Sequence, residues 1–206
     1  MNITIIGAGN VGKALAGAWR KAGHNVTVGV RSPGDPKFAD LTQQGIKVTD
    51  VGTSARGADV ILLAVPWGAV ETTIKALGPL DGKILVDAIN PFTPSLDLAL
   101  GFTYSAGETV ARLAKGARVV KAFNTTGAGN MANPTYPGGK LMMAVAGDDA
   151  EAKKTVMGLA GDIGFDPVDV GPIAMSRQLE SLAALWVKFA YAQQQGPNFG
   201  FAILRR

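Results

Sequence analysis

The chain has 206 residues, of which 47% are hydrophobic and 17% are charged, and its formal net charge is +4. This length suits one domain with a substantial core, and the composition excludes a disordered tail or a charge-rich coiled coil. The chain contains no cysteine, which excludes disulfides, thiolate catalysis and thiolate metal sites. The basic residues are scattered, so we expect no nucleic-acid surface, and the surplus positive charge favours an anionic small molecule as ligand.

The start of the chain lacks the basic region and the long apolar core of a signal peptide. No uncharged apolar run approaches the length of a membrane span. We therefore expect a cytoplasmic protein that does not enter a membrane.

Apolar runs typical of β-strands alternate with helix-like stretches along the chain. The predicted strands are Asn2–Ile6, Asn25–Val30, Ile46–Val48, Val60–Val65, Ile84–Ala88, Arg118–Phe123, Leu141–Ala146 and Phe165–Val170. The predicted helices are Val11–Ala22, Ala69–Leu77, Glu108–Lys115, Ala150–Ala160 and Ala174–Tyr191. Several strands are apolar throughout, which is typical of a parallel sheet covered on both faces.

This order predicts the Rossmann variety of the α/β class: a doubly wound, mainly parallel sheet with helices on both faces. We expect residues 1–206 to form a single dinucleotide-binding domain. The C-terminal βα elements, from about residue 140 onward, are then an extension that completes the substrate pocket.

The first predicted strand is followed directly by a glycine-rich turn that opens a helix. Gly7, Gly9 and Gly12 have the spacing of a dinucleotide-binding loop in the strand–turn–helix setting that this motif requires. Backbone N–H groups near Asn10 and Val11, with the helix dipole behind them, are expected to face the pyrophosphate.

The second predicted strand ends with an arginine where NAD enzymes carry an acidic residue. Arg31 can form a charge-assisted pair with a 2′-phosphate, Ser32 can add a hydroxyl, and Lys37 is a candidate second cation. The first acidic residue of the chain is Asp35. The pattern therefore predicts that NADP(H) is preferred over NAD(H); the alternative is that Arg31 is a solvated residue at a strand end.

Further candidates follow the next strands, because ligands bind beyond the carboxyl ends of a doubly wound sheet. Trp67 either forms a wall of the cleft or caps the sheet, and the amides of Asn90 and Asn124 either bond to the nicotinamide and its ribose or serve as turn residues. The cofactor-binding candidates at these strand ends are Ala64, Val65, Pro66, Trp67, Asn90, Pro91, Asn124 and Ala128.

Other chemistry has few candidate residues. Lys121 lies inside an apolar strand, and we expect its side chain to extend past the sheet edge rather than to reach the site. His24, the only histidine, lies in a helix-to-strand turn away from the strand ends that form the cleft. We therefore expect no metal site, and no general acid or base is assigned. Hydride transfer between two bound cofactors depends on positioning more than on a proton donor.

The last predicted helix, Ala174–Tyr191, carries an apolar stripe. Met175, Leu179, Leu182, Trp186 and Phe189 recur at helical spacing, so we expect the helix to cover one face of the sheet. The alternative is that Trp186 or Tyr191 reaches a subunit interface or the substrate pocket.

Four motifs together resemble the NADP oxidoreductases that depend on coenzyme F420, a 5-deazaflavin. They are Ile5–Gly12, Ala64–Trp67, Asp87–Pro91 and Val120–Thr125. The chain is also similar to the oxidoreductase domain of the STEAP metalloreductases and, more distantly, to the N-terminal domain of pyrroline-5-carboxylate reductases.

The resemblance implies hydride transfer between NADPH and a deazaflavin or flavin, with F420, FMN or FAD as co-substrate, in a homodimer. It implies pyrophosphate contacts from Gly9 to Gly12, a 2′-phosphate contact at Arg31, and Val65, Asn90 and Ala128 near the ribose and nicotinamide. Family members often carry a serine where this chain has Val30, and the archaeal enzymes a histidine near Asn124.

Two other functions stay open at this point. One is reduction of a small imine or carbonyl, which usually needs a proton donor and an added helical domain. The other is a catalytically silent NADP(H)-binding module that senses the cofactor or serves a partner protein.

Overall fold

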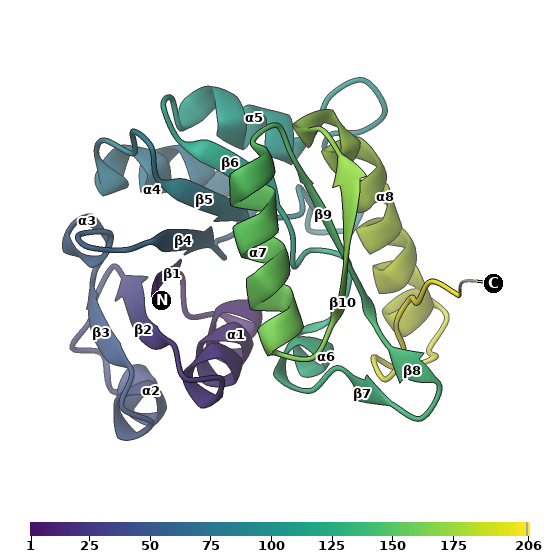
Figure 1. The fold of residues 1–206 in the computed structure, drawn as a ribbon, viewed down its shortest axis with the longest axis horizontal. Coiled ribbons are helices and arrows are strands. Elements are labelled where there is room, and N and C mark those ends of the chain that lie inside the picture. Colours follow the sequence, from purple (N-terminus) through teal and green to yellow (C-terminus); the bar gives the residue numbers. More distant parts are fainter. Residues whose placement is uncertain (205) are drawn as a thin grey trace.

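The computed structural model describes residues 1–204 and 206, and its centre is an eight-stranded sheet (Figure 1). The strand order is β10-β9-β6-β5-β4-β1-β2-β3. The strands are β1 Asn2–Ile6, β2 Asn25–Val30, β3 Lys47–Asp50, β4 Val60–Leu63, β5 Ile84–Asp87, β6 Arg118–Lys121, β9 Met142–Gly147 and β10 Asp166–Gly171. A small hairpin, β7 Thr135–Tyr136 and β8 Gly139–Lys140, lies outside this sheet.

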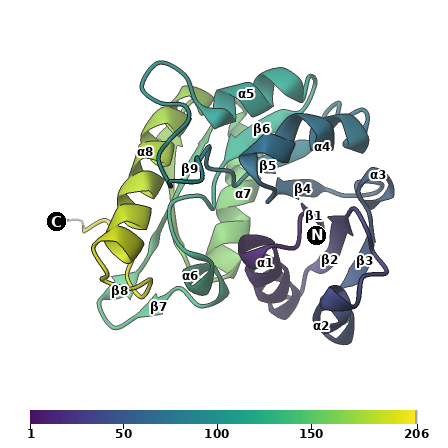
Figure 2. The ribbon, with the colours of Figure 1, turned by 180° about the vertical axis from the view of Figure 1, so that it is seen from behind.

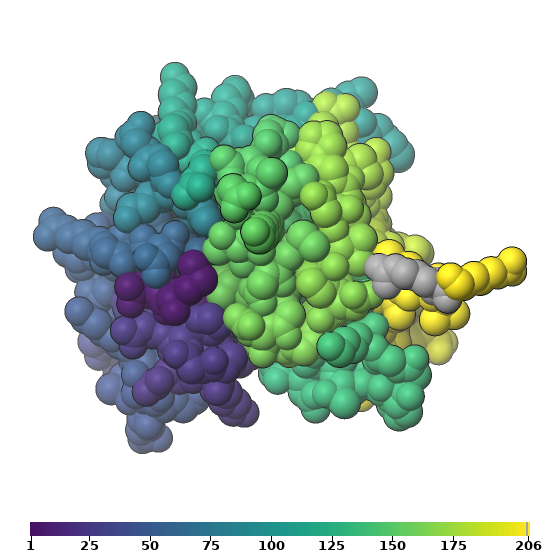
Figure 3. Space-filling model, in the orientation of Figure 1, coloured from purple at the N-terminus to yellow at the C-terminus, as the bar shows by residue number. Residues whose placement is uncertain are grey.

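The first six strands are parallel and have the order of a dinucleotide-binding sheet, which confirms the predicted fold class. The last two strands are parallel to each other, but β9 pairs antiparallel with β6, from Val120 opposite Gly147 to Lys121 opposite Ala146. The C-terminal extension therefore adds to one edge of the sheet in the reverse direction. In Figure 3 it occupies the side of the molecule opposite the N-terminal strands.

Helices cover both faces, as Figures 1 and 2 show from opposite sides. The α-helices are α1 Asn10–Lys21, α2 Ala39–Gln43, α3 Val51–Ser54, α4 Val70–Leu77, α5 Ala106–Leu113, α6 Ala128–Ala132, α7 Ala150–Asp162 and α8 Ser176–Val187. Short 3₁₀ turns at η1 Pro36–Phe38, η2 Trp67–Ala69 and η3 Ile173–Met175 precede α2, α4 and α8, and a π turn, η4 Lys188–Ala192, follows α8.

The core forms two layers because alternate strand residues point to opposite faces. Ile5 packs with α1 and α7, whereas its neighbour Ile6 packs with α4 and α5. Trp19 of α1 is fully buried in the first layer, and its indole N–H donates to the carbonyl of Leu159 on α7 at 3.0 Å. Both faces of the central strands are thus buried, as their continuous apolar sequences predict.

Candidate functional site

A cavity of about 560 Å³ lies beyond the carboxyl ends of β1, β2 and β4, where the strand order reverses. This reversal is the usual ligand site of a doubly wound sheet. The lining combines the glycine turn, the end of β2 and the first turns of α4: Ile6, Gly7, Ala8, Gly9, Gly29, Val30, Arg31, Ser32, Lys37, Phe38, Val51, Ala64, Val65, Pro66, Ala69, Thr72 and Thr73.

Two of the three glycines in the turn, Gly7 and Gly12, leave no room for a side chain. Gly7 has a φ of +102°, and a Cβ there would overlap the carbonyl oxygen of Ala64. A Cβ at Gly12 would overlap the carbonyl oxygen of Gly7, so α1 packs directly on the turn. Gly9, which caps α1, has open space in the direction of a Cβ. Asn10 and Val11 form the first turn of α1, whose N–H groups are available to an anion.

The β2 side of the cavity carries two basic side chains, of which one is unpaired and the other is in an ion pair. Arg31 is exposed, and within the part of the chain that the structure describes its guanidinium has no hydrogen bond or ion pair. Lys37 is paired instead: its Nζ lies 2.6 Å from the carboxylate of Asp35, which also accepts the Lys37 N–H at 3.1 Å. The hydrogen bond from Lys37 holds the pKa of Asp35 below its ordinary value.

The loop that carries Lys37 is tied to helix α1. Lys13 Nζ donates to the carbonyl of Lys37 at 3.1 Å and to the carboxylate of Asp40 at 2.8 Å. The bond from Lys13 holds the pKa of Asp40 below its ordinary value. Helix α1 therefore positions both the glycine turn and the backbone of the cationic loop.

The opposite wall of the cavity comes from β4 and α4. Of the candidates from this strand end, Ala64, Val65 and Pro66 line the wall, whereas Trp67 packs on the core layer around α4. Thr72 and Thr73 also line the wall, and sequence reasoning missed them. The available signal was Pro66, which ends the strand and starts the helix whose first turns face the cleft.

Asn90, Pro91, Asn124 and Ala128 lie outside this cavity lining, at the ends of β5 and β6 and the start of α6. Asn90 and Asn124 bond to each other: Asn90 Nδ2 donates to the Asn124 carbonyl at 2.8 Å, and Asn124 Nδ2 donates to Asn90 Oδ1 at 3.0 Å. Asn124 Nδ2 also donates to the carbonyl of Leu179 at 3.2 Å, while Asn124 Oδ1 is buried without a hydrogen bond. The two predicted amides thus form one unit between the two strand ends.

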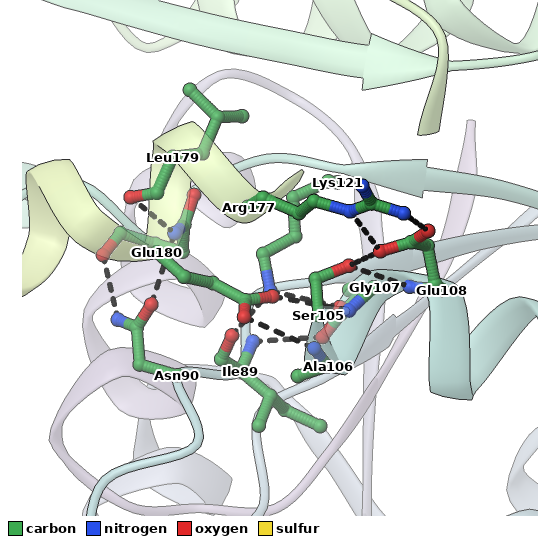
Figure 4. A network of polar contacts seen from close by, with 12 residues as sticks. Ile89, Asn90, Ser105, Ala106, Gly107, Glu108, Lys121, Arg177, Leu179 and Glu180 are labelled. Carbon is green, nitrogen blue, oxygen red and sulfur yellow. Dashed lines mark hydrogen bonds and ion pairs between the residues drawn. The ribbon is translucent and has the colours of Figure 1, made fainter. Parts of the chain in front are cut away.

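The expectation that Lys121 extends to solvent is wrong. Lys121 is fully buried, because β9 pairs with β6 and covers what would have been the sheet edge. Its Nζ lies 2.9 Å from the carboxylates of both Asp87 and Glu180, which are also buried, and it donates to the carbonyl of Ile89. Figure 4 shows Lys121 reaching Glu180 across the network.

The network continues into the start of α5. Glu180 accepts the N–H groups of Ala106 at 3.0 Å and Gly107 at 3.1 Å, in the first turn of that helix (Figure 4). A second contact joins α5 and α8: Arg177 Nε donates to the Glu108 carboxylate at 2.9 Å. This bond lowers the pKa of Glu108 and raises that of Arg177.

Helix α8 covers β9, as expected from its apolar stripe, through Leu179 packed on Ala144 and Ala146. Trp186 is buried, stacks on Phe199 with ring centroids 5.3 Å apart, and donates from Nε1 to the Phe199 carbonyl at 3.0 Å. It therefore joins α8 to the C-terminal segment.

Outside these regions the described residues offer little reactive chemistry. His24 lies between the N-terminus and Asp162, with Nε2 3.0 Å from the carboxylate. Within residues 1–204 and 206, no three His, Cys, Asp or Glu side chains are grouped so that they could hold a metal ion. Over the same residues, no helix combines the length and apolar character that crossing a membrane requires.

Comparison with known proteins relates the chain to NADP-dependent enzymes. Residues 2–91 match the family model described as NADP oxidoreductase, coenzyme F420-dependent. The F420-dependent NADP reductase of Methanocaldococcus jannaschii is 30% identical over 158 residues, covering 71% of this chain and 70% of that protein. Metalloreductase STEAP3 of Rattus norvegicus is 32% identical over 180 residues, or 87% of this chain, but the match spans only 36% of the metalloreductase.

Solved structures have the same architecture. A crystal structure from Arthrobacter sp. FB24, assigned as an F420-dependent NADP reductase, has a TM-score of 0.90 and 33% identity, and the match covers 98% of this chain and 99% of that chain. A reductive aminase from Aspergillus terreus has a TM-score of 0.69 at 24% identity, covering 94% of this chain and 62% of the aminase. The second likeness shows the fold alone.

Proposed function

The chain belongs to the family of F420-dependent NADP oxidoreductases, and from this premise we propose that it transfers a hydride between NADPH and a deazaflavin or flavin, with F420 as the first candidate. One observation supports the cofactor half most strongly. The glycine turn and the unpaired Arg31 line the same cavity, and no carboxylate lines it among the described residues. A 2′-phosphate would find a free cation there, whereas a ribose diol would find no acidic acceptor.

The proposed cofactor contacts begin in the cavity and continue beyond its lining, to the first turn of α1, to Trp67 and to the ends of β5 and β6. The pyrophosphate lies against Gly7, Gly9, Asn10, Val11 and Gly12, and the 2′-phosphate against Arg31, Ser32 and Lys37. The ribose and nicotinamide lie near Ala64, Val65, Pro66, Trp67, Asn90, Pro91, Asn124 and Ala128. Lys37 can contact the phosphate while paired with Asp35, because its ammonium group has three donors, and its backbone is held by Lys13 and Asp35.

The acceptor half rests on chemistry and charge. Transfer of a hydride from nicotinamide to a flavin-type ring needs alignment of the two rings rather than a protein acid or base. F420 carries phosphate and glutamate groups, and a chain of net charge +4 favours such an anion.

We also propose the cytoplasm as the place of action and a homodimer as the working form. A chain without cysteine has no disulfide that would point to an oxidising compartment. The outer side of α8 and the turn after it leave Leu185, Phe189 and Tyr191 exposed, which supplies apolar surface for a second copy.

The test is a comparison of hydride acceptors. The protein is mixed with NADPH and, in separate reactions, with F420, FMN, FAD or a panel of imines, while NADPH fluorescence is followed. We expect rapid oxidation with F420 or a flavin. Oxidation with imines alone would replace this proposal with imine reduction, and tight NADPH binding without any acceptor would favour a cofactor-sensing module.

A further inference from the structure

The peptide group of Ile89, at the carboxyl end of β5, is held at both of its polar atoms by buried charges. Asp87 Oδ1 accepts the Ile89 N–H at 2.9 Å, and Lys121 Nζ donates to the Ile89 carbonyl. Asp87 and Lys121 are both fully buried and lie 2.9 Å apart. This peptide group therefore has much less freedom than an ordinary loop peptide.

We call Asp87 and Lys121, with the Ile89 peptide between them, the clamp. Glu180 connects this clamp to two other elements. It pairs with Lys121 at 2.9 Å and accepts the first N–H groups of α5, so a single carboxylate joins β6, α5 and α8 (Figure 4). The buried set holds two carboxylates and one ammonium, and the positive end of the α5 dipole offsets the excess negative charge.

The residues next to the clamp are the two asparagines of the proposed nicotinamide end. Asn90 follows Ile89 in the chain, and Leu179, whose carbonyl bonds to Asn124, precedes Glu180. Asn90 and Asn124 also bond to each other. The clamp and the two asparagines are therefore connected at both ends, through the chain at Ile89–Asn90 and through Leu179 next to Glu180.

We infer that Asp87, Lys121 and Glu180 are positioning residues that fix the Ile89 peptide and thereby the orientation of the Asn90 carboxamide toward the nicotinamide half of the cofactor. The inference rests on the proposed function, since it requires NADPH in the cleft. Stability alone is a poor explanation for the triad, because well-packed apolar side chains usually stabilise a core as well as a buried ion set does. A buried ion set does more for geometry, since each partner restricts the others in direction as well as distance.

Glu180→Gln tests the inference. The carboxylate accepts from Lys121, Ala106 and Gly107, whereas a glutamine has one acceptor oxygen and directs an NH₂ group at one of these donors. If Asn90 loses its orientation, the cofactor loses one neutral hydrogen bond. The Kd for NADPH should then rise about 2- to 10-fold. The Kd for 2′,5′-ADP, which lacks the nicotinamide half, should stay unchanged. Calorimetry measures both.

Glu108→Gln is the matched control, because Glu108 links the same two helices through Arg177 but does not contact Ile89. It should leave both dissociation constants unchanged. An unchanged NADPH affinity in Glu180→Gln, or an equal loss for NADPH and 2′,5′-ADP, would overturn the inference. Failure of the proposed NADP(H) site, on which the inference rests, would look different: wild-type protein would bind 2′,5′-ADP no better than 5′-AMP.

Two further measurements apply if Glu180→Gln does not fold. The double variant Lys121→Met with Glu180→Gln removes one charge of each sign, so the net buried charge stays the same, and it should show the same selective loss of NADPH affinity. In the wild-type protein, the Ile89 amide should exchange with deuterium only through global unfolding. Exchange through local opening would contradict the clamp.

Discussion

Arg31 is distinguished from the other cations around the cleft by its lack of a partner. Lys13 and Lys37 are bonded to Asp40 and Asp35, whereas the Arg31 guanidinium is exposed at the cavity wall with no bonded group among the described residues. Its charge is therefore available to a ligand without breaking an existing contact.

Replacing Arg31 with alanine should weaken NADPH binding about 10- to 150-fold, because a charge-assisted hydrogen bond contributes about 1.5–3 kcal/mol. NADH binding should change little, since NADH lacks the 2′-phosphate. Fluorescence titration with both cofactors checks this, with Lys21→Ala, a charge removed at the far end of α1, as control. Equal losses for the two cofactors would refute the role given to Arg31.

The sequence identifies residues of the cavity better than it identifies their partners. The glycine turn and Arg31 follow local spacing rules, and both line the cavity. The burial of Lys121 depends on β9 returning antiparallel beside β6, and on Glu180 approaching from α8, 59 residues away in the chain. A charged residue inside an apolar strand was the visible signal, but its partners come from pairings that no local pattern specifies.

Among the elements, α6 and α8 meet at a contact that leaves no room for a side chain. Gly127 caps α6, and a Cβ there would overlap the ring of Trp186. Trp186 has little freedom to shift, because it stacks on Phe199 and bonds to its carbonyl.

Gly127→Ala should therefore lower the free energy of unfolding by about 1–3 kcal/mol, the usual cost of overpacking. Gly129→Ala, two residues along in the helix and facing open space, should instead raise it by up to about 1 kcal/mol through helix propensity. Urea denaturation measures both variants. Equal stabilities would mean that Trp186 can move aside.

The link between α5 and α8 should make stability depend on pH. The bond from Arg177 depresses the pKa of Glu108, so this carboxylate stabilises the fold above its unfolded pKa of about 4.3, and the contribution is lost as the pH falls through the depressed value. Glu108→Gln should be less stable than wild type at pH 6, and the gap should close toward pH 3.

Urea midpoints across this pH range provide the measurement. Glu71→Gln removes an exposed carboxylate paired with Lys75 and should change little at any pH, since exposed pairs contribute little. Parallel pH curves for wild type and Glu108→Gln would contradict the expectation.

Element boundaries show where local patterns fail. The predicted strand to Phe123 ends at Lys121, and Phe123 itself adopts a left-handed φ of +59° despite full burial. The helix predicted from Glu108 begins at Ala106, because Ser105 caps it by accepting the Glu108 N–H. Apolar periodicity locates such elements, while their ends depend on caps and on tertiary contacts.

At the scale of the whole molecule, the end of α8 and the C-terminal segment each carry exposed apolar side chains. Leu185 and Phe189 are each 46% exposed, and Leu204 is 91% exposed. Sedimentation analysis should give about twice the chain mass of 21.2 kDa if a second copy covers them.

Glutamate at both Leu185 and Phe189 should then produce a monomer. Phe102→Glu, which changes an equally apolar residue that is 93% exposed on a different loop, should leave the dimer intact. A wild-type mass of one chain at every concentration would rule the dimer out.

The cavity lining determines the proton balance of cofactor binding. Its only ionisable side chains among the described residues are Arg31 and Lys37; it has no carboxylate or imidazole. Any proton released near neutral pH should then come from the cofactor's own 2′-phosphate, whose second ionisation lies at about pH 6 if it resembles a phosphorylated side chain. Calorimetry in buffers of different ionisation enthalpy should register proton release on NADPH binding near pH 6 and none at pH 8. The pH dependence of binding is then determined by the ionisation of the cofactor and not by that of the protein.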